Sequence, residues 1–222
     1  MFCDITGIVF RQVKISGGKR MIQIFSREKG KISAGTLLSE KSKSKSALSI
    51  RPFTYGQYNL DIKPSNYINI RSAETIDANY QLGENPDRFL EASYILEFTD
   101  KLLPEGKKET KIFDLLVLSL KLLCARNENF KLITISYMIK VFQESGVFPV
   151  VFSSNFNDVE LISSLNFDIL NIIEYLANNP LERMEKLTLE SNNTETIFLV
   201  LKEFSEIHLD IGPLKSDINF IC

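Results

Sequence analysis

The sequence predicts an α+β protein, with a small five-stranded β-barrel followed by an all-helical region. Short β-branched segments separated by glycine turns fill residues 4–75, and apolar residues recur at helical spacing after residue 86. From Met1 to Arg71, 13 basic residues stand against 4 acidic ones, a net charge of +9, whereas the remainder has a net charge of −11. We therefore expect two domains, residues 1–78 and 79–222.

The predicted strands are short and closely spaced. Gly17-Gly18 is a hairpin signal between a first extended segment and a second one. Five such strands in about 75 residues are typical of a small barrel such as an OB-fold, which binds single-stranded nucleic acid through a basic groove and aromatic platforms. The expected strands after the hairpin turn are Arg20–Phe25, Lys31–Leu38, Ala47–Leu60 and Tyr67–Ile76, and the candidate platforms are Phe53, Tyr55, Tyr58 and Tyr67, of which alternate ones should point into the core.

The helical part begins after a predicted linker at residues 79–86. Asn85 is a good N-cap and Pro86 a good first helical residue, so we expect a helix from there to Leu103. Leu96 and Leu103 should be buried on its apolar side. His208 falls on or beside a later apolar stripe, which indicates a packed core or boundary residue rather than a ligand or base.

A serine-lysine run lies in the basic part of the chain. Lys41, Lys43 and Lys45 alternate with serine, a pattern that cannot pack a core and is typical of a loop. The natural partner of such a concentrated positive surface is a polyanion. The alternative is a solvated loop whose lysines only keep the protein soluble. Further cations flank the run: Arg27, Lys29, Lys31 and Arg51.

Several classes of protein are disfavoured by what the sequence lacks. Three dispersed cysteines and one histidine cannot supply a tetrahedral zinc site, so we expect no metal, and their sparse use fits a reducing cytoplasm. Phosphate-cradling, dinucleotide, metalloprotease and nucleophile-elbow motifs are missing, which favours a protein that is not an enzyme and has no cofactor. No signal peptide is evident, and the most apolar run, Leu115–Cys124, is too short to span a membrane.

Several segments, taken in order, resemble the RecO family of bacterial recombination mediators. The N-terminal similarity is carried by Thr6–Val9, by Phe25–Ser33, by the basic loop and by Arg51–Phe53. The run Ala92–Gly106 is similar to the signature helix of the family and its exit turn. Weaker matches are Phe142–Pro149 and Leu214–Ser216.

The resemblance implies an N-terminal OB-fold and a helical C-terminal domain. Many members carry a four-cysteine zinc motif after the turn that Val147–Pro149 resembles, whereas this sequence has no cysteine between Cys124 and Cys222. The region Val150–Asn166 is therefore expected to pack without metal. Family members often continue the Lys-Ser pair with basic residues, but Asp217 follows Ser216 here, which shifts the expected DNA contact onto the OB-fold.

The resemblance also implies a function in DNA repair and recombination. The expected protein binds single- and double-stranded DNA, promotes annealing, and works with RecR to load RecA on strands coated by single-strand-binding protein, in the cytoplasm at the nucleoid. The alternatives are an OB-fold adaptor that binds proteins rather than DNA and a nucleotide-dependent enzyme. The candidate phosphate contacts are Arg27, Lys29, Lys31, Lys41, Lys43, Lys45 and Arg51, with Lys14, Lys19 and Arg20 as second choices.

The family is also expected to capture the acidic, Phe-terminated tail of single-strand-binding protein on its helical domain. Such a peptide needs an apolar pocket and a nearby cation. Lys131 and Lys140 flank a helical stripe that includes Met138 and Phe142, so these four residues are the candidate peptide site. The alternative is that both lysines are ordinary surface residues.

Overall fold

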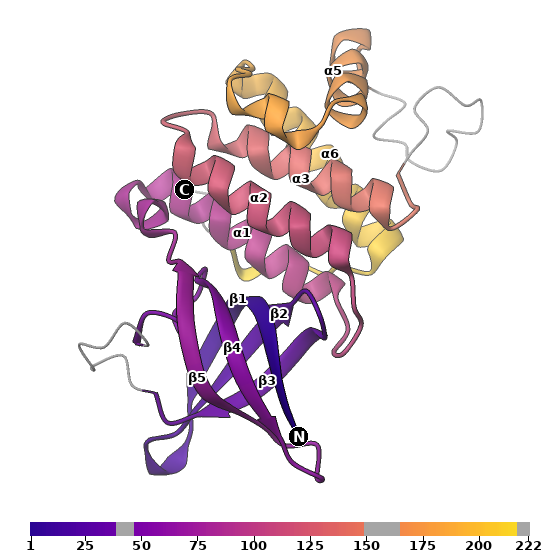
Figure 1. Ribbon diagram of the computed structural model, residues 1–222. Helices are drawn as coiled ribbons and strands as arrows, with labels where there is room; N and C mark the ends of the chain where they lie inside the picture. The colour runs from indigo at the N-terminus through magenta and orange to yellow at the C-terminus, as the bar shows by residue number, and fades with distance from the viewer. Residues whose placement is uncertain (39–46, 149–164, 217–222) are drawn as a thin grey trace. The chain divides into compact units, whose positions relative to one another are not determined.

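The computed structural model describes residues 1–38, 47–148 and 165–216 (Figure 1). The first part is a β-barrel and the rest is helical, which confirms the predicted fold class. The strands are β1 (Phe2–Lys14), β2 (Arg20–Ser26), β3 (Gly30–Thr36), β4 (Tyr55–Ile62) and β5 (Ile68–Asp77). The α-helices are α1 (Pro86–Leu102), α2 (Thr110–Ala125), α3 (Phe130–Glu144), α5 (Phe167–Asn178) and α6 (Ser191–Leu209), with short 3-10 turns η1 (Ser16–Gly18), η3 (Tyr80–Glu84) and η4 (Leu181–Glu185).

The barrel closes in the strand order β1-β2-β3-β5-β4. Neighbouring strands are antiparallel except for β3 and β5, which run parallel where Gly35 lies opposite Asn69. Because side chains alternate along a strand, one set points inward and forms the core. That core consists of Ile5, Val9, Ile22, Ile24, Ile32, Ala34, Ile50, Tyr58, Leu60 and Ile70.

The prediction of a continuous strand from Ala47 to Leu60 is wrong in its first half. The chain turns repeatedly there, and β4 begins only at Tyr55. The amide of Thr54 donates to the carbonyl of Arg51, and Phe53 has a φ of 69°. The strand prediction includes the β-branched Ile50, whereas this residue is buried in the barrel core at a turn. The spacing of apolar residues alone does not distinguish a loop residue that fills the barrel core from a strand residue.

The chain forms two compact units. The barrel unit joins residues 1–81 with 99–117, and the helical unit joins residues 82–98 with the chain from 118 onward. In the barrel unit the ring of Phe113 lies 5.4 Å from that of Phe25 and 6.1 Å from that of Tyr55. The end of α1, the start of α2 and the loop between them thus belong with the strands. The predicted boundary at residue 78 remains a prediction.

The helical unit is organised around the almost fully buried α3. The rings of Phe98 and Phe142 lie 6.2 Å apart, and those of Phe142 and Phe204 lie 5.0 Å apart. His208 was expected in the core or at its boundary, but it is exposed, and its ring lies 4.2 Å from that of Phe204 at the end of α6. The buried face of α6 therefore ends at Phe204 and Ser205, before His208.

Helix α1 begins as predicted. The side-chain oxygen of Asn85 accepts hydrogen bonds from the amides of Asp87 and Arg88, at 2.9 and 3.1 Å, which confirms the N-cap. Leu96 and Leu103 are both buried, as expected. The carboxylate of Glu97 accepts hydrogen bonds from the amides of Lys215 and Ser216 and from the Ser216 hydroxyl. The chain beyond α6 is thereby fastened to α1.

Candidate nucleic-acid interface

The hairpin between β1 and β2 carries cations and no acidic residue of its own. Between Asp4 and Glu28 the sequence has five basic residues and no acidic one. Lys14 and Lys19 are exposed on either side of the turn, which is held by the hydrogen bond from the Ile15 amide to the Lys19 carbonyl. Gly17 and Gly18 have φ values of 71° and 74°, a conformation that favours glycine. The double glycine thus permits the tight turn that presents these lysines.

Arg20 and Arg11 belong to the same hairpin but are held differently. Arg20 was a second-choice contact, yet its side chain is buried and donates to Gln12 Oε1 at 2.8 Å. Arg11, which sequence reasoning did not select, is exposed and donates to Gln23 Oε1 at 3.0 Å. Exposure on a strand depends on register, so the only signal in the sequence for an exposed Arg11 is the alternation of side chains along the strand.

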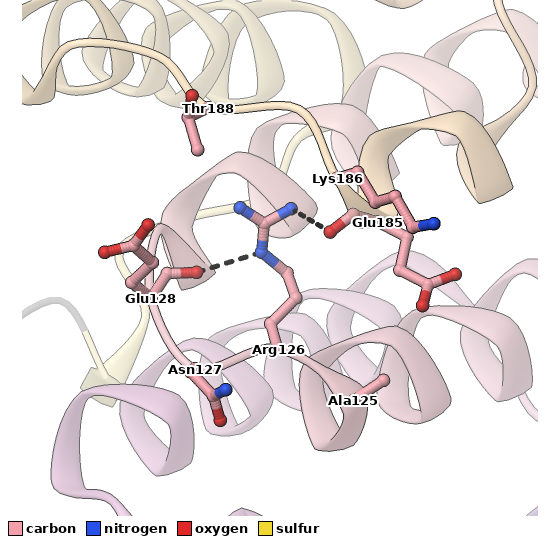
Figure 2. A pocket seen from close by; sticks show the side chains of 7 residues that line it. All are labelled: Ala125, Arg126, Asn127, Glu128, Glu185, Lys186 and Thr188. Atoms are coloured by element: carbon pink, nitrogen blue, oxygen red, sulfur yellow. Dashed lines mark hydrogen bonds between the residues drawn. The ribbon is translucent and has the colours of Figure 1, made fainter.

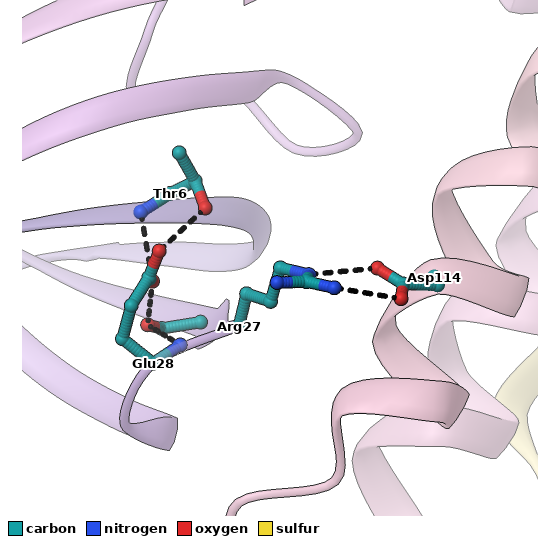
Figure 3. Close-up of polar contacts among 5 residues, drawn as sticks. Thr6, Arg27, Glu28 and Asp114 are labelled. Carbon is teal, nitrogen blue, oxygen red and sulfur yellow. Dashed lines mark hydrogen bonds and ion pairs between the residues drawn. The ribbon is translucent and has the colours of Figure 1, made fainter.

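The turn between β2 and β3 holds the next group of cations in a fixed conformation. Ser26 Oγ accepts from the amides of Glu28 and Lys29, at 3.2 and 3.1 Å. The carboxylate of Glu28 accepts from the amide and the hydroxyl of Thr6, both at 2.9 Å (Figure 3). These contacts fix the turn against β1 and leave Arg27 exposed on one side of it.

Arg27 forms a bidentate ion pair within the barrel unit. Its Nε and Nη2 donate to the two carboxylate oxygens of Asp114, at 2.9 and 3.1 Å (Figure 3). The hydrogen bond to Asp114 raises the pKa of Arg27 above its ordinary value. About half of each side chain is exposed. An anion that approaches Arg27 therefore meets a cation that already has a matched carboxylate.

Lys31 is more deeply engaged. Its Nζ donates to the carbonyl oxygen of Asp100 at 2.6 Å and to Asp100 Oδ1 at 2.9 Å, and only a tenth of the side chain is exposed. Along the same strand, Ser33 Oγ donates to Glu105 Oε1 at 3.2 Å. The amide of Gly106 donates to the carbonyl of Lys31 at 2.8 Å. An acidic segment of the barrel unit thus lies against β3 and neutralises its cation.

The structure describes two of the remaining predicted contacts. Arg51 is exposed and Lys29 is half-buried, and Lys41, Lys43 and Lys45 lie outside the described residues. Of the candidate aromatic platforms, Tyr58 is fully buried with its hydroxyl donating to the Ser49 carbonyl at 2.7 Å, and burial raises its pKa. Tyr67 is exposed, whereas Phe53 and Tyr55 are partly covered.

The comparisons with known proteins agree over nearly the whole chain. The family profile described as "Recombination protein O N terminal" matches residues 1–79, and the one described as "Recombination protein O C terminal" matches residues 83–218. The chain belongs to the recombination protein O (RecO) family. This assignment supports a role in DNA repair and recombination.

Three similar relatives carry the name DNA repair protein RecO. The protein of Alkaliphilus metalliredigens is 26% identical over 95% of this chain and 95% of its own length. That of Caldanaerobacter subterraneus is 24% identical over 97% of this chain and 96% of its own length. That of Bacillus cereus is 28% identical over 67% of this chain and 59% of its own length. The RecO similarity thus spans both compact units.

The four residues expected to capture a partner peptide are not arranged as an open pocket in this RecO family chain. Met138 and Phe142 have no exposed surface. Lys131 forms an ion pair with Glu195, and its Nζ lies 4.9 Å from the ring centroid of Phe198. Lys140 Nζ donates to the carbonyl of Ala177 at 2.6 Å, and burial lowers its pKa. The apolar stripe is core, and both cations are engaged.

Neither a metal site nor a membrane span is found in the part of the chain that the structure describes. There, no three His, Cys, Asp or Glu side chains come together as a metal site, and no helix is both long and apolar enough to cross a bilayer. The segment that follows the predicted Gly-aromatic-Pro turn, Val150–Asn166, lies almost entirely outside the described residues. Its predicted packing without metal stays a prediction.

A polar hollow of about 420 Å³ lies in the helical unit beside Arg126 (Figure 2). The guanidinium donates to the main-chain carbonyls of Glu128 and Glu185, at 2.9 and 3.0 Å, and also to those of Met184 and Leu187. Burial lowers the pKa of Arg126. Sequence reasoning missed Arg126 because its partners are main-chain carbonyls. Every residue type has such a carbonyl, so the sequence does not mark which residues accept these hydrogen bonds. Its four hydrogen bonds make Arg126 a structural clamp in the wall of the hollow.

Proposed function

We propose that this RecO family chain is a non-catalytic recombination mediator that binds single- and double-stranded DNA through its barrel. In this proposal it promotes annealing and acts with RecR to load RecA on strands coated by single-strand-binding protein. The observation that carries the DNA binding is the β1–β2 hairpin, which exposes Lys14 and Lys19 in a stretch without an acid from residue 5 to 27. A polyanion gains most electrostatic binding free energy from cations that are not already offset by a carboxylate.

The chemistry of the contact is expected to be independent of DNA sequence. Lysines on a hairpin and on an alternating Lys/Ser run present point charges and not the bidentate geometry that reads base edges. They contact phosphates, whose occupation releases counterions and makes binding salt-dependent. Annealing needs such contacts, because they hold a strand and leave its bases available for pairing.

A salt titration of DNA affinity tests the proposal. On single strands log K falls with log[salt] by about 0.7 for each neutralised phosphate. Replacing Lys14 and Lys19 with alanine should flatten the slope by up to about 1.4, and replacing Lys41, Lys43 and Lys45 by up to about 2. Each loss should be similar for different DNA sequences.

The matched control is the double variant Lys121→Ala/Lys186→Ala, which removes the same charge from exposed positions of the helical unit. It should leave the slope unchanged. If the wild-type protein binds neither form of DNA at low salt, the barrel serves a protein partner instead, and the proposal is wrong. Equal loss of slope in the control would mean that net charge, rather than the barrel surface, governs binding.

A further inference from the structure

Helix α5 lies in a long stretch of the sequence that has no basic residue. From residue 141 to residue 182 the chain has six acidic residues and no lysine, arginine or histidine. Two of the acids, Asp168 and Glu174, belong to α5. The cations at either end of the stretch donate to neutral oxygens, Lys140 to a main-chain carbonyl at 2.6 Å and Arg183 to a side-chain amide at 2.8 Å. The acidic charge of α5 is therefore not offset by a cation of its own segment.

One face of α5 packs into the helical unit. Ile169, Ile173 and Leu176 are buried at helical spacing, and the helix lies against α3 and α6. At the start of α5 the side chain of Asn166 accepts a hydrogen bond from the amide of Ile169 at 2.9 Å. Because this N-cap satisfies an amide of the first turn, the helix is fixed from Phe167 onward.

The opposite face of α5 exposes two aromatic rings. Phe167 is 69% exposed and Tyr175 is 46% exposed. With Asn171, which is also exposed, they recur at every fourth position and therefore share one face of the helix. The helix rises by about 12 Å from Phe167 to Tyr175, at 1.5 Å per residue. Aromatic side chains exposed together in this way are typical of surfaces that bind another protein.

The two carboxylates of α5 lie beside these rings. Asp168 is exposed and follows Phe167, and Glu174 is half-buried and precedes Tyr175. Residues seven positions apart are nearly aligned along a helix axis, so Asp168 is aligned with Tyr175 and Glu174 with Phe167. Each end of the exposed face thus offers one ring and one carboxylate.

We propose that this surface, the α5 aromatic face, docks an arginine-bearing segment of a partner protein. The inference goes beyond the proposed DNA binding and does not depend on it. A guanidinium stacks on an aromatic ring and also pairs with a carboxylate, so one arginine uses both groups at each end of the face. Two arginines about 12 Å apart would occupy both ends, a distance that about four residues of extended chain span. The α5 aromatic face consists of Phe167, Asp168, Asn171, Glu174 and Tyr175.

Charge complementarity favours this partner over the alternatives. DNA and acidic peptides would bring like charge to Asp168 and Glu174. A purely apolar partner would cover both carboxylates without pairing them, which costs free energy. A lysine segment matches the charge, but its ammonium group is strongly hydrated and is not planar, so it stacks less well on a ring than a guanidinium does. Arginine is thus the side chain that satisfies both the rings and the carboxylates.

Binding of two labelled peptides, measured by fluorescence anisotropy at low salt, tests the inference. One peptide has arginine at every fourth position of a glycine-serine sequence, and the other has lysine at the same positions. The wild-type protein should bind the arginine peptide more tightly than the lysine peptide. Phe167→Ser/Tyr175→Ser should weaken the arginine complex by about tenfold, as expected for two lost cation–π contacts, and should weaken the lysine complex less.

Two further variants separate the role of the rings from that of the charge. Phe167→Leu/Tyr175→Leu keeps an apolar side chain at each position and guards against a folding defect, and it should still abolish the preference for arginine. Asp168→Asn/Glu174→Gln keeps the rings and should weaken both peptide complexes, with a reduced dependence on salt.

The matched control is Leu199→Ser/Ile207→Ser on α6, where the two aliphatic side chains are 53% and 55% exposed and Glu206 is exposed beside them. It should bind both peptides as the wild type does. Equal affinity of the wild type for the two peptides, or aromatic variants with wild-type affinity, would overturn the proposal. Loss of self-association in the aromatic variants, with peptide binding unchanged, would also overturn it and would assign the face to a second copy of the chain. These outcomes leave the proposed DNA binding intact, because the salt titration with DNA measures it separately.

Discussion

In the barrel unit the buried cation Lys31 meets a carboxylate, Asp100, at 2.9 Å. In the helical unit, by contrast, three ionisable groups are held by neutral partners. Glu91 accepts from Thr134 Oγ1 at 2.6 Å, Arg126 donates to carbonyls, and Lys140 donates to the carbonyl of Ala177. Burial consequently raises the pKa of Glu91 and lowers the pKa values of Arg126 and Lys140.

The difference concerns what each charge contributes to stability. A matched pair offsets much of the desolvation cost of both partners. A charge held only by dipoles keeps its desolvation cost, so its removal can destabilise or stabilise the fold, depending on how many hydrogen bonds it supplies. Arg126 supplies four hydrogen bonds to main-chain carbonyls, whereas Glu91 accepts one hydrogen bond from Thr134. Removal of the Arg126 charge is therefore expected to destabilise the fold, and removal of the Glu91 charge is expected to stabilise it.

The largest effect is expected for Arg126→Ala. Four carbonyls of the helical unit would lose their donor, and the variant should lose about 3–5 kcal/mol of unfolding free energy. Urea unfolding followed by far-UV circular dichroism measures it. Arg183→Ala is the control, because Arg183 is exposed and donates to Asn179 on the same helix–turn segment. Comparable losses in both variants would show that Arg126 is not a clamp.

Glu91→Gln is expected to stabilise the protein at alkaline pH. Burial raises the pKa of Glu91 from its ordinary 4.5 to about 7. Between those two values the folded state holds more protons than the unfolded state, so stability falls as pH rises. Above pH 7 the full cost, about 3 kcal/mol, is present, and the neutral amide should recover much of it.

The measurement is urea unfolding of wild type and Glu91→Gln at several pH values from 5 to 8. The two proteins should be close in stability at pH 5 and diverge as pH rises. Glu206→Gln, on the exposed side of α6, should follow the wild type throughout. A constant difference across the range would mean that Glu91 stays charged and that its burial is compensated elsewhere.

The smallest effect is expected for the matched pairs of the barrel unit. A double-mutant cycle with Lys31→Ala and Asp100→Ala should give a coupling energy of about 1–2 kcal/mol, because the lysine is almost covered. The same cycle on the half-exposed Arg27 and Asp114 should give less, and salt should reduce it further. Equal coupling energies in both pairs would show that the burial of an ion pair does not determine its coupling energy here.

Local patterns predicted the fold but only part of the candidate interface. The Asn85-Pro86 cap and the glycine hairpin act through neighbours in sequence and appear as expected, and the stripe of α1 buries Leu96 as predicted, whereas the stripe of α6 ends before His208. The partners of Arg27 and Lys31 lie 87 and 69 residues away, and nothing in the spacing of those residues marks the pairing. A count of cations therefore located the basic barrel, but it did not show on which face of the barrel the cations are paired with carboxylates.

The contact between Glu97 and Ser216 has a consequence for the order of events during synthesis. Its two residues are separated by 119 positions, whereas every segment of the barrel unit has been translated once residue 117 has been added. Because chains fold from the N-terminal side as they are made, the barrel can close while α1 still lacks the partner of Glu97. A nascent chain whose residues 1–117 have left the ribosome before residue 216 is added would thus present a finished basic barrel with an unfinished helical unit.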